Sequence, residues 1–437
     1  MKRAKSHQRP VPPSRTALVQ IEKPIYGGAF LARLEGKATF VPLVPPGEEV
    51  RIRIVEDKRS YATAEPEELA KISPSRIAPR CPHFGPCGGC NYQHADYEIQ
   101  LAIKQQILRE TLHRAGIPAP EHIPMLSGNP WHYRNRIRAA FDRAGRLGYR
   151  ARRSHDVVPI SECPIAAPLL VQAALGAAEI LRTSKPTFRP IEISLFCNAD
   201  ETKLLASIYV QGSATQGFDQ FAEGWNERVP ALVGVELVEQ GRLDQEPKQI
   251  ARWGETSITC QVGGIDYRVD HGAFFQVNRW LIDSLVQRVL AERQGQLAWD
   301  LFAGVGLFSR RLAERFTEVA AVEYSPYATQ CLRKNLEGTP GRAITSETLA
   351  FLRRQQRTPR PDLIVVDPPR AGLGSETTAL LGKIAAAEIV YVSCDPTTLA
   401  RDLRALLAMG YSLASVTLAD LFPQTFHLET VVELRRS

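Results

Sequence analysis

The chain has 437 residues, of which 44% are hydrophobic and 23% charged, and its formal net charge is +7. This length suggests roughly two to four domains, and the composition is ordinary for a globular protein. No apolar run approaches the ~20 residues of a transmembrane helix, and the N-terminus lacks a secretory signal. We therefore expect a cytoplasmic monomer with no membrane partner and no obligate protein partner. The positive charge allows a polyanionic partner without proving one.

The first part of the chain changes its pattern near residue 16. Residues 1–15 are basic and proline-rich and lack periodicity, so we expect a disordered tail. Residues 16–72 alternate between short β-prone runs and turns that contain glycine or proline. This alternation is typical of a small, oligonucleotide-binding (OB-like) β-barrel. The candidate strands are 17–21, 29–33, 38–41 and 50–55.

A cluster of cysteines in residues 73–93 indicates a metal site. Cys81, Cys87 and Cys90 have the spacing C-x5-C-x2-C, and proline and glycine between them can bend the backbone. Cys163, which precedes a proline outside any regular pattern, is the best candidate for a fourth ligand. Three clustered thiols and a distant one suit a [4Fe–4S] cluster, with zinc or unligated thiols as the alternatives. Three isolated cysteines are expected in the core: Cys197, Cys260 and Cys331.

The middle of the chain combines one helix with a β-rich region. Within residues 94–118, the stretch 97–115 has the periodicity of an amphipathic helix, which we expect to pack on the C-terminal domain. Residues 119–270, which include Cys163, contain many alternating runs and predict a central, mostly antiparallel β domain. Within it, 131–138 interleaves aromatic residues with arginines. This stretch could bind single-stranded nucleic acid, or it could be a half-buried strand with a solvated basic face.

Residues 271–437 alternate between predicted strands and helices, which indicates an α/β fold with a doubly wound parallel sheet. The final two strand candidates follow each other without a helix between them. A parallel sheet closed by such a hairpin resembles the class I, Rossmann-like methyltransferase architecture. The strand candidates are 297–302, 319–323, 363–366, 389–393, 413–421 and 430–434.

A glycine loop follows the first of these strands. Gly304 and Gly306 let the backbone approach a ligand closely, but Ser309 stands where a dinucleotide-binding loop would have its third glycine. Glu323 ends the second strand, where a carboxylate can accept hydrogen bonds from both hydroxyls of a ribose. S-adenosylmethionine (AdoMet) has this ribose and lacks a pyrophosphate, so the looser loop suits it.

Cys394 directly follows the strand 389–393, and a helix with Asp395 as its N-cap comes next. Ligands bind at this edge of open α/β sheets, and a helix N-terminus favours the thiolate, so we interpret Cys394 as a nucleophile and not as a buried structural cysteine. Asp367 also ends a strand, in the motif Asp-Pro-Pro-Arg. Amino-group methyltransferases usually have an aromatic residue where Arg370 stands, which argues against N-methylation.

Several motifs together identify a family that the sequence resembles. They are Phe275-Gln-Val-Asn, the loop from Asp300 to Gly306, Asp367-Pro-Pro-Arg, Ser393-Cys-Asp-Pro and the stretch 422–429. These motifs closely resemble those of RNA uracil-C5 methyltransferases of the RumA/TrmA type. The N-terminal region, with its Tyr-Gly-Gly motif at 26–28, resembles a TRAM domain, which is an RNA-binding module. With the cysteine cluster included, the resemblance covers nearly the whole chain.

The resemblance implies a role for individual residues. Cys394 would be the nucleophile and Glu429 the general base. Two positions depart from the family pattern. Leu307 replaces an asparagine found in some members, and Ser346-Glu347 replaces a more usual Gly-Asp, so Glu347 is our candidate for the adenine-side contact. The implied AdoMet contacts are Gln276, Phe302, Glu323 and Asp367.

The chemistry explains why these residue types are needed. Uracil C5 is a weak nucleophile until the Cys394 thiolate adds to C6 and generates an enolate. After methyl transfer, Glu429 would remove the C5 proton so that the thiolate can leave. The base must be flipped out of its stack, and Phe274 or Phe275 could stack on RNA unless they belong to the core. We expect 23S ribosomal RNA as the substrate.

Three alternatives remain. The same reaction could act on transfer RNA, or the chain could be a non-catalytic RNA-binding or RNA-folding protein. Intact Cys394, Glu429 and Asp367 argue against the second, since a binding module needs none of them. DNA cytosine-C5 methylation uses similar thiol chemistry, but its nucleophile follows an earlier strand, so the order of motifs opposes it.

Overall fold

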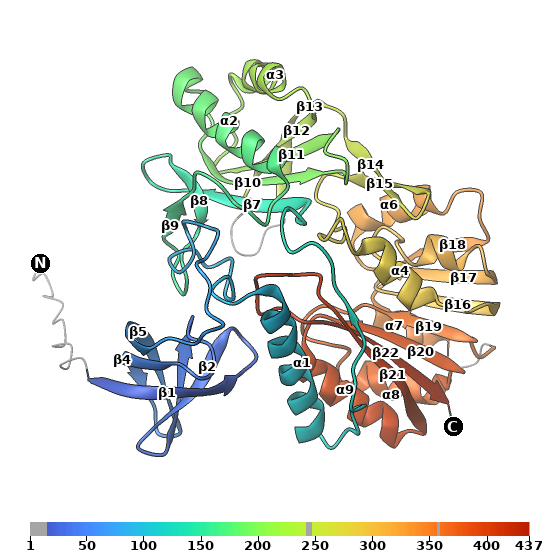
Figure 1. Ribbon diagram of the computed structural model, residues 1–437. Helices are drawn as coiled ribbons and strands as arrows, with labels where there is room; N and C mark the ends of the chain where they lie inside the picture. The colour runs from blue at the N-terminus through green and yellow to red at the C-terminus, as the bar shows by residue number, and fades with distance from the viewer. Residues whose placement is uncertain (1–14, 242–246, 356–358, 437) are drawn as a thin grey trace, which may run out of the picture.

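The computed structural model describes residues 15–241, 247–355 and 359–436, so the tail expected at 1–15 lies outside it except for Arg15. Figure 1 shows a small barrel, a central sheet with two helices, and a large C-terminal sheet covered by helices. Within the described ranges, no helix has both the length and the apolar character needed to cross a membrane.

The N-terminal strands form a closed barrel in the order β1-β2-β3-β5-β4. Its interior includes Phe30, Val41 and Ile52, all fully buried. β5 was missing from the expected strands because its inward residues are only alanines, Ala62 and Ala64, and several glutamates follow them. The strands are β1 (Thr16–Pro24), β2 (Ala29–Leu34), β3 (Lys37–Pro42), β4 (Glu49–Asp57) and β5 (Tyr61–Lys71).

An irregular segment that contains the clustered cysteines connects the barrel to helix α1 (Tyr97–Arg114). Asp96 caps this helix by accepting a hydrogen bond from the Ile99 N–H at 2.9 Å. As expected, the helix contacts the C-terminal domain, where it packs on α9 (Pro396–Ala408), and it also contacts β1. Its buried side includes two polar residues, Gln100 and Lys104, on a mostly apolar face.

The central sheet has seven strands in the order β13-β12-β11-β10-β7-β8-β9. β11 and β12 pair in parallel, and the other pairs are antiparallel. Helices α2 and α3 cover the sheet, so this part is α+β and not only β (Figure 1). The elements are β7 (Arg136–Phe141), β8 (Leu147–Arg150), β9 (Val157–Pro159), α2 (Pro168–Ser184), β10 (Pro190–Cys197), β11 (Leu204–Val210), α3 (Phe218–Arg228), β12 (Leu232–Glu239) and β13 (Lys248–Gly254).

Three features differ from the expected central domain of 119–270. The strand expected at 131–138 begins only at Arg136, because the preceding residues bond to the loop around Cys163 and to Val277. β6 (Met125–Leu126) pairs with β21 (Tyr411–Ala419) at the edge of the C-terminal sheet. The hairpin of β14 (Ser257–Val262) and β15 (Ile265–Asp270) packs its apolar residues mainly into the core of the C-terminal domain.

The C-terminal sheet has eight strands in the order β18-β17-β16-β19-β20-β22-β21-β6. β16 to β20 pair in parallel, and β22 is antiparallel to both neighbours. The order reverses between β16 and β19, so a crevice is expected at the carboxyl ends of these strands. The remaining elements are α4 (Ile282–Leu290), β16 (Gly295–Leu301), α5 (Ser309–Leu312), β17 (Phe316–Glu323), α6 (Pro326–Asn335), β18 (Gly341–Thr345), α7 (Thr348–Arg354), β19 (Leu363–Val366), α8 (Ser375–Ile384), β20 (Glu388–Ser393) and β22 (Glu429–Arg436).

Candidate active site

The glycine loop leaves β16 through a run of left-handed backbone conformations. Phe302, Gly304 and Gly306 have φ angles of 67°, 57° and 93°. A Cβ on Gly306 would lie only 2.7 Å from Cδ1 of Leu332, so the close approach to α6 requires glycine. An aromatic residue with positive φ is uncommon, and such strain often occurs at ligand sites.

Glu323, at the end of β17, holds this loop in place. Its Oε2 accepts a hydrogen bond from the Gly304 N–H at 2.8 Å, and its Oε1 accepts from the Ser325 N–H at 2.7 Å. The Ser346 N–H donates to the main-chain carbonyl of Glu323 at 3.0 Å, which places the loop after β18 nearby. Glu347 follows as an exposed residue at the start of α7.

A small pocket lies at the switch point between β16 and β19. Gln276 and Asp367 face each other in it, with Nε2 of Gln276 3.4 Å from Oδ2 of Asp367. Phe274 is 59% exposed at this pocket, whereas Phe275 is 3% exposed and packs against the rings of Phe196 and Tyr267, so Phe275 belongs to the core. The pocket lining comprises Phe274, Phe275, Gln276, Phe302, Ala303, Gly304, Val305, Leu307, Phe308 and Asp367.

Three carboxyl groups lie along this sheet edge, of which Asp300 and Glu429 are buried and Asp367 is half-buried. Burial, opposed by hydrogen bonds from Ser309, raises the pKa of Asp300 to about 7. Burial and the charge of Asp300 raise the pKa of Asp367 to about 7. Burial and the charge of Asp367 raise the pKa of Glu429 well above its usual value. A buried carboxylate with a raised pKa is a stronger proton acceptor than an ordinary glutamate.

Cys394 lies between β20 and α9, half-buried. Burial and the negative charges of Glu429 and Asp367 raise the pKa of its thiol to about 11, and the charge of Arg370 opposes them. In this structure burial and the two carboxylates outweigh any stabilisation of the thiolate by the helix end. Two N–H groups at the start of α9 donate to Oδ1 of Asp395 instead, at 2.9 and 3.0 Å.

Glu429 begins β22 and is 4% exposed, so it is not a surface acid. β20 and β22 are antiparallel, and the last registered pair of their ladder is Ser393 with Thr430. Continuing this register by one residue brings Cys394 opposite Glu429. The structure thus brings together the residues expected to be nucleophile and base.

The loop of residues 420–428, just before Glu429, is held by buried contacts that the sequence analysis missed. Nζ of Lys104 lies 2.5 Å from Oδ1 of Asp420 and donates to the Phe422 carbonyl at 2.9 Å. Nε2 of Gln100 donates to Oε1 of Gln424 at 2.9 Å. The sequence spacing could have revealed these contacts, because Gln100 and Lys104 are four residues apart and share one face of α1 with buried leucines.

The cysteine segment contacts the same loop. The N–H groups of Asn91 and Tyr92 donate to the Gln424 carbonyl at 2.9 and 3.1 Å, and the Tyr133 hydroxyl donates to the Pro423 carbonyl at 3.1 Å. Oδ1 of Asn91 accepts from the Phe426 N–H at 3.4 Å. The residues directly after Cys90, together with Tyr133, therefore support the chain that leads to Glu429.

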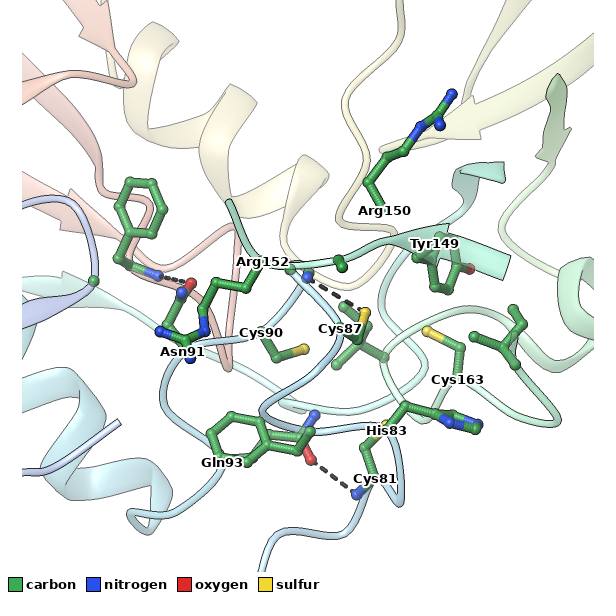
Figure 2. A pocket seen from close by; sticks show the side chains of 18 of the residues that line it. Cys81, His83, Cys87, Cys90, Asn91, Gln93, Tyr149, Arg150, Arg152 and Cys163 are labelled. Carbon is green, nitrogen blue, oxygen red and sulfur yellow. Dashed lines mark hydrogen bonds between the residues drawn. The ribbon is translucent and has the colours of Figure 1, made fainter. Parts of the chain in front are cut away.

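All four cysteines expected as metal ligands line one cavity of about 530 Å³ (Figure 2). Burial raises the pKa of Cys90 to about 12, and the Gly89 N–H donates to Sγ of Cys87 at 3.4 Å. Among the residues that the structure describes, no three His, Cys, Asp or Glu side chains converge to hold a metal ion. As expected, Cys197, Cys260 and Cys331 are buried.

Comparisons with known proteins identify the family to which this architecture belongs. A family model for tRNA (uracil-5-)-methyltransferases matches residues 358–437, and a TRAM domain model matches residues 13–66. A Shewanella denitrificans protein named 23S rRNA (uracil(1939)-C(5))-methyltransferase RlmD is 31% identical over 92% of both chains. The chain belongs to the RNA uracil-C5 methyltransferase family. This confirms the family that the sequence motifs indicate.

One further relative and one solved structure add to these comparisons. An Aquifex aeolicus protein named an uncharacterized RNA methyltransferase is 32% identical over 95% of this chain and 97% of its own length. The fold is shared with the Pyrococcus abyssi tRNA (uracil-54, C5)-methyltransferase in complex with S-adenosyl-L-homocysteine. That structure has a TM-score of 0.77, 23% identity, and coverage of 95% of this chain and 100% of its own. The expected fold class, an α/β methyltransferase with a TRAM barrel, is confirmed.

Proposed function

We propose that this member of the family uses AdoMet to methylate C5 of a uracil in RNA, with 23S ribosomal RNA as the favoured substrate. The observation that carries the proposal is the placement of Cys394 and Glu429 at the ends of paired strands β20 and β22. Asp367 lines the glycine-loop pocket and raises the pKa values of both groups, which supports a single site shared by the pocket and these two residues.

The residues present fit AdoMet. The Cβ position of Gly304 faces open space, so the loop can accept a ligand against its backbone. Each oxygen of Glu323 accepts one backbone hydrogen bond, which leaves acceptor capacity for ribose hydroxyls. Gln276, Phe302 and Asp367 would hold the rest of the ligand from the pocket wall. When bound, AdoMet supplies an electrophilic methyl group.

The chain's own groups divide the reaction between them. Cys394 loses its proton to solvent and its sulfur forms a bond to C6 of the uracil, which moves the electron pair of the C5–C6 double bond toward C5 and the O4 carbonyl. C5 would use this electron density to take the methyl group from AdoMet, which would leave as S-adenosylhomocysteine. Glu429 then accepts the C5 proton, the C5–C6 double bond reforms, and the sulfur leaves as thiolate.

The thiol requires activation, because burial and the charges of Glu429 and Asp367 raise its pKa. Arg370, which is exposed beside the pocket motif, stabilises the thiolate. Phe274 would stack on an RNA base beside the flipped uracil, since it is both exposed and part of the pocket wall. The TRAM barrel would bind flanking RNA.

The substrate assignment follows the relatives and is tested by mapping. The name of the Shewanella protein specifies uracil 1939 of 23S rRNA, and this relative matches nearly the full chain. Mapping 5-methyluridine in rRNA and tRNA from cells with and without the gene identifies the target. Loss of the modification from tRNA alone would replace ribosomal RNA by transfer RNA, and an unchanged map would refute the proposed reaction.

The cysteine cavity supports a [4Fe–4S] cluster bound by Cys81, Cys87, Cys90 and Cys163. The donor set is four thiols, one of which accepts a backbone N–H, and the thiols surround a cavity instead of meeting at a point. A cluster several atoms wide suits this arrangement better than a single zinc ion. Anaerobic purification should yield brown protein with about four iron atoms. Stoichiometric zinc without iron would contradict the assignment.

The matched test of this cluster uses one variant from the cavity and one from the core. Cys163→Ser should lower the iron content and bleach the visible absorbance, because it removes the ligand outside the 81–90 cluster. Cys260→Ser, in β14, should keep the wild-type iron content, because Cys260 is buried elsewhere.

A further inference from the structure

The RNA-binding barrel touches the expected nucleophile directly. Tyr26 lies in the turn between β1 and β2, and its hydroxyl donates a hydrogen bond to the main-chain carbonyl of Cys394 at 3.2 Å. These residues are 368 positions apart in the chain. The contact therefore joins the N-terminal barrel to the end of β20, at the point where the reactive sulfur is attached.

The turn that carries Tyr26 is shaped for this contact. Gly27 and Gly28 have φ angles of 102° and 85°, which favour glycine. A Cβ on Gly28 would lie 3.0 Å from Nδ2 of Asn91 and 3.1 Å from Cδ1 of Phe426. Because Gly28 has no side chain, the turn can pack closely against both the cysteine segment and the loop before Glu429.

The ring of Tyr26 makes a second contact with the catalytic region. It meets the ring of Phe426 edge-on, with centroids 5.7 Å apart and an interplanar angle of 79°. Burial and the charge of Asp395 raise the pKa of Tyr26, so the phenol remains protonated and can donate at any pH at which the enzyme works. Tyr26 thus contacts the peptide of the nucleophile and the loop of the base together.

We propose that Tyr26 is a positioning residue of the methyl-transfer site, which fixes the Cys394 peptide and couples the RNA-binding barrel to the nucleophile. This inference rests on the proposed function. A backbone carbonyl held by a hydrogen bond restricts rotation of the Cys394 peptide, and the direction of Cα–Cβ, and hence of the sulfur, follows from it. A small error in the direction from which the Cys394 sulfur approaches C6 of the uracil slows the addition step without weakening the binding of RNA.

The test is Tyr26→Phe, which keeps the ring on Phe426 and removes only the hydroxyl. The measurement is the single-turnover rate of covalent adduct formation with 5-fluorouridine RNA, as a function of RNA concentration, in the AdoMet-loaded full-length enzyme. We expect the maximal rate to fall about 5- to 10-fold, which is the effect of one lost hydrogen bond. The half-saturating RNA concentration and the melting temperature should stay close to wild type.

The control is Tyr411→Phe in β21, which removes a hydroxyl that donates to the Ala386 carbonyl at 3.0 Å, at the end of the strand remote from Glu429. It should leave the maximal rate unchanged. A Tyr26→Phe enzyme with the wild-type maximal rate would overturn the proposal. A weaker affinity for RNA with an unchanged maximal rate would also overturn it and make Tyr26 an RNA contact. If wild-type enzyme forms no adduct with its mapped substrate, the proposed function fails and not the role of Tyr26 alone.

Discussion

Cys394 and Glu429 face each other across the end of the β20–β22 ladder, one residue beyond the Ser393–Thr430 pair. Facing residues on antiparallel strands have Cα atoms roughly 4.5–5.5 Å apart, so both groups can reach one pyrimidine ring. The charge of Glu429 also raises the pKa of Cys394, which agrees with this proximity. The antiparallel strand β22 thus pairs the proposed nucleophile with the proposed base.

Cys394→Ala should abolish methyl transfer. Without the sulfur no enolate forms, so the rate should fall by about 10³-fold or more while RNA still binds. The measurement is transfer of radioactive methyl from AdoMet to a cognate transcript, together with a binding titration. Cys331→Ala, a buried cysteine on α6, serves as the control. Methylation at the wild-type rate by Cys394→Ala would show that the nucleophile lies elsewhere.

Glu429→Gln should stall the reaction after methyl transfer. The C5 proton then has no acceptor, so the sulfur–C6 bond persists and a protein–RNA adduct accumulates on denaturing gels. Turnover should fall about 10²- to 10⁴-fold, the usual contribution of a general base. The control is Glu433→Gln, which changes a glutamate farther along the same strand, β22. Normal turnover without an adduct would remove the base assignment.

Arg370→Gln should make the thiol less reactive. The charge of Arg370 lowers the pKa of Cys394, so its removal raises that pKa and leaves less thiolate at any given pH. Alkylation of Cys394 by iodoacetamide at pH 8, followed by mass spectrometry of the peptide, should slow about two- to threefold, because Arg370 is exposed and screened. The whole pH profile should move to higher pH. Arg333→Gln, on α6, should leave the pH profile of alkylation unchanged. Faster alkylation in Arg370→Gln would contradict the expected rise in the pKa of Cys394.

Lys104→Met should destabilise the protein. The Lys104–Asp420 pair is 0% exposed on both sides, so removing the lysine leaves a buried carboxylate without its counter-charge. Losing one partner of such a pair typically costs about 3–5 kcal/mol in the free energy of unfolding. Urea unfolding of the single variant and of Lys104→Met with Asp420→Leu checks this. The double variant should be more stable than the single one, and a single-variant loss below about 1 kcal/mol would contradict the expectation.

The sequence was informative about elements whose signals are local. The strand at 389–393 and the capped helix after it could be read from β-branched residues, Asp395 and Pro396. The sequence did not predict β5 or the helices α2 and α3. β5 has weak local preference, because small alanines and glutamates occupy it, and only closure of the barrel makes its backbone pairing favourable.

The sequence by itself determined which chemistry is present: a thiol, a buried-strand glutamate and a glycine loop, each at the end of a recognisable element. The tertiary structure decided how these groups behave. It placed Glu429 and Asp367 close enough to raise the pKa of Cys394, and it brought Tyr26 to the carbonyl of that cysteine. Charge interactions and hydrogen bonds depend on distances between residues that are remote in the chain, and only the packing of strands and loops sets those distances.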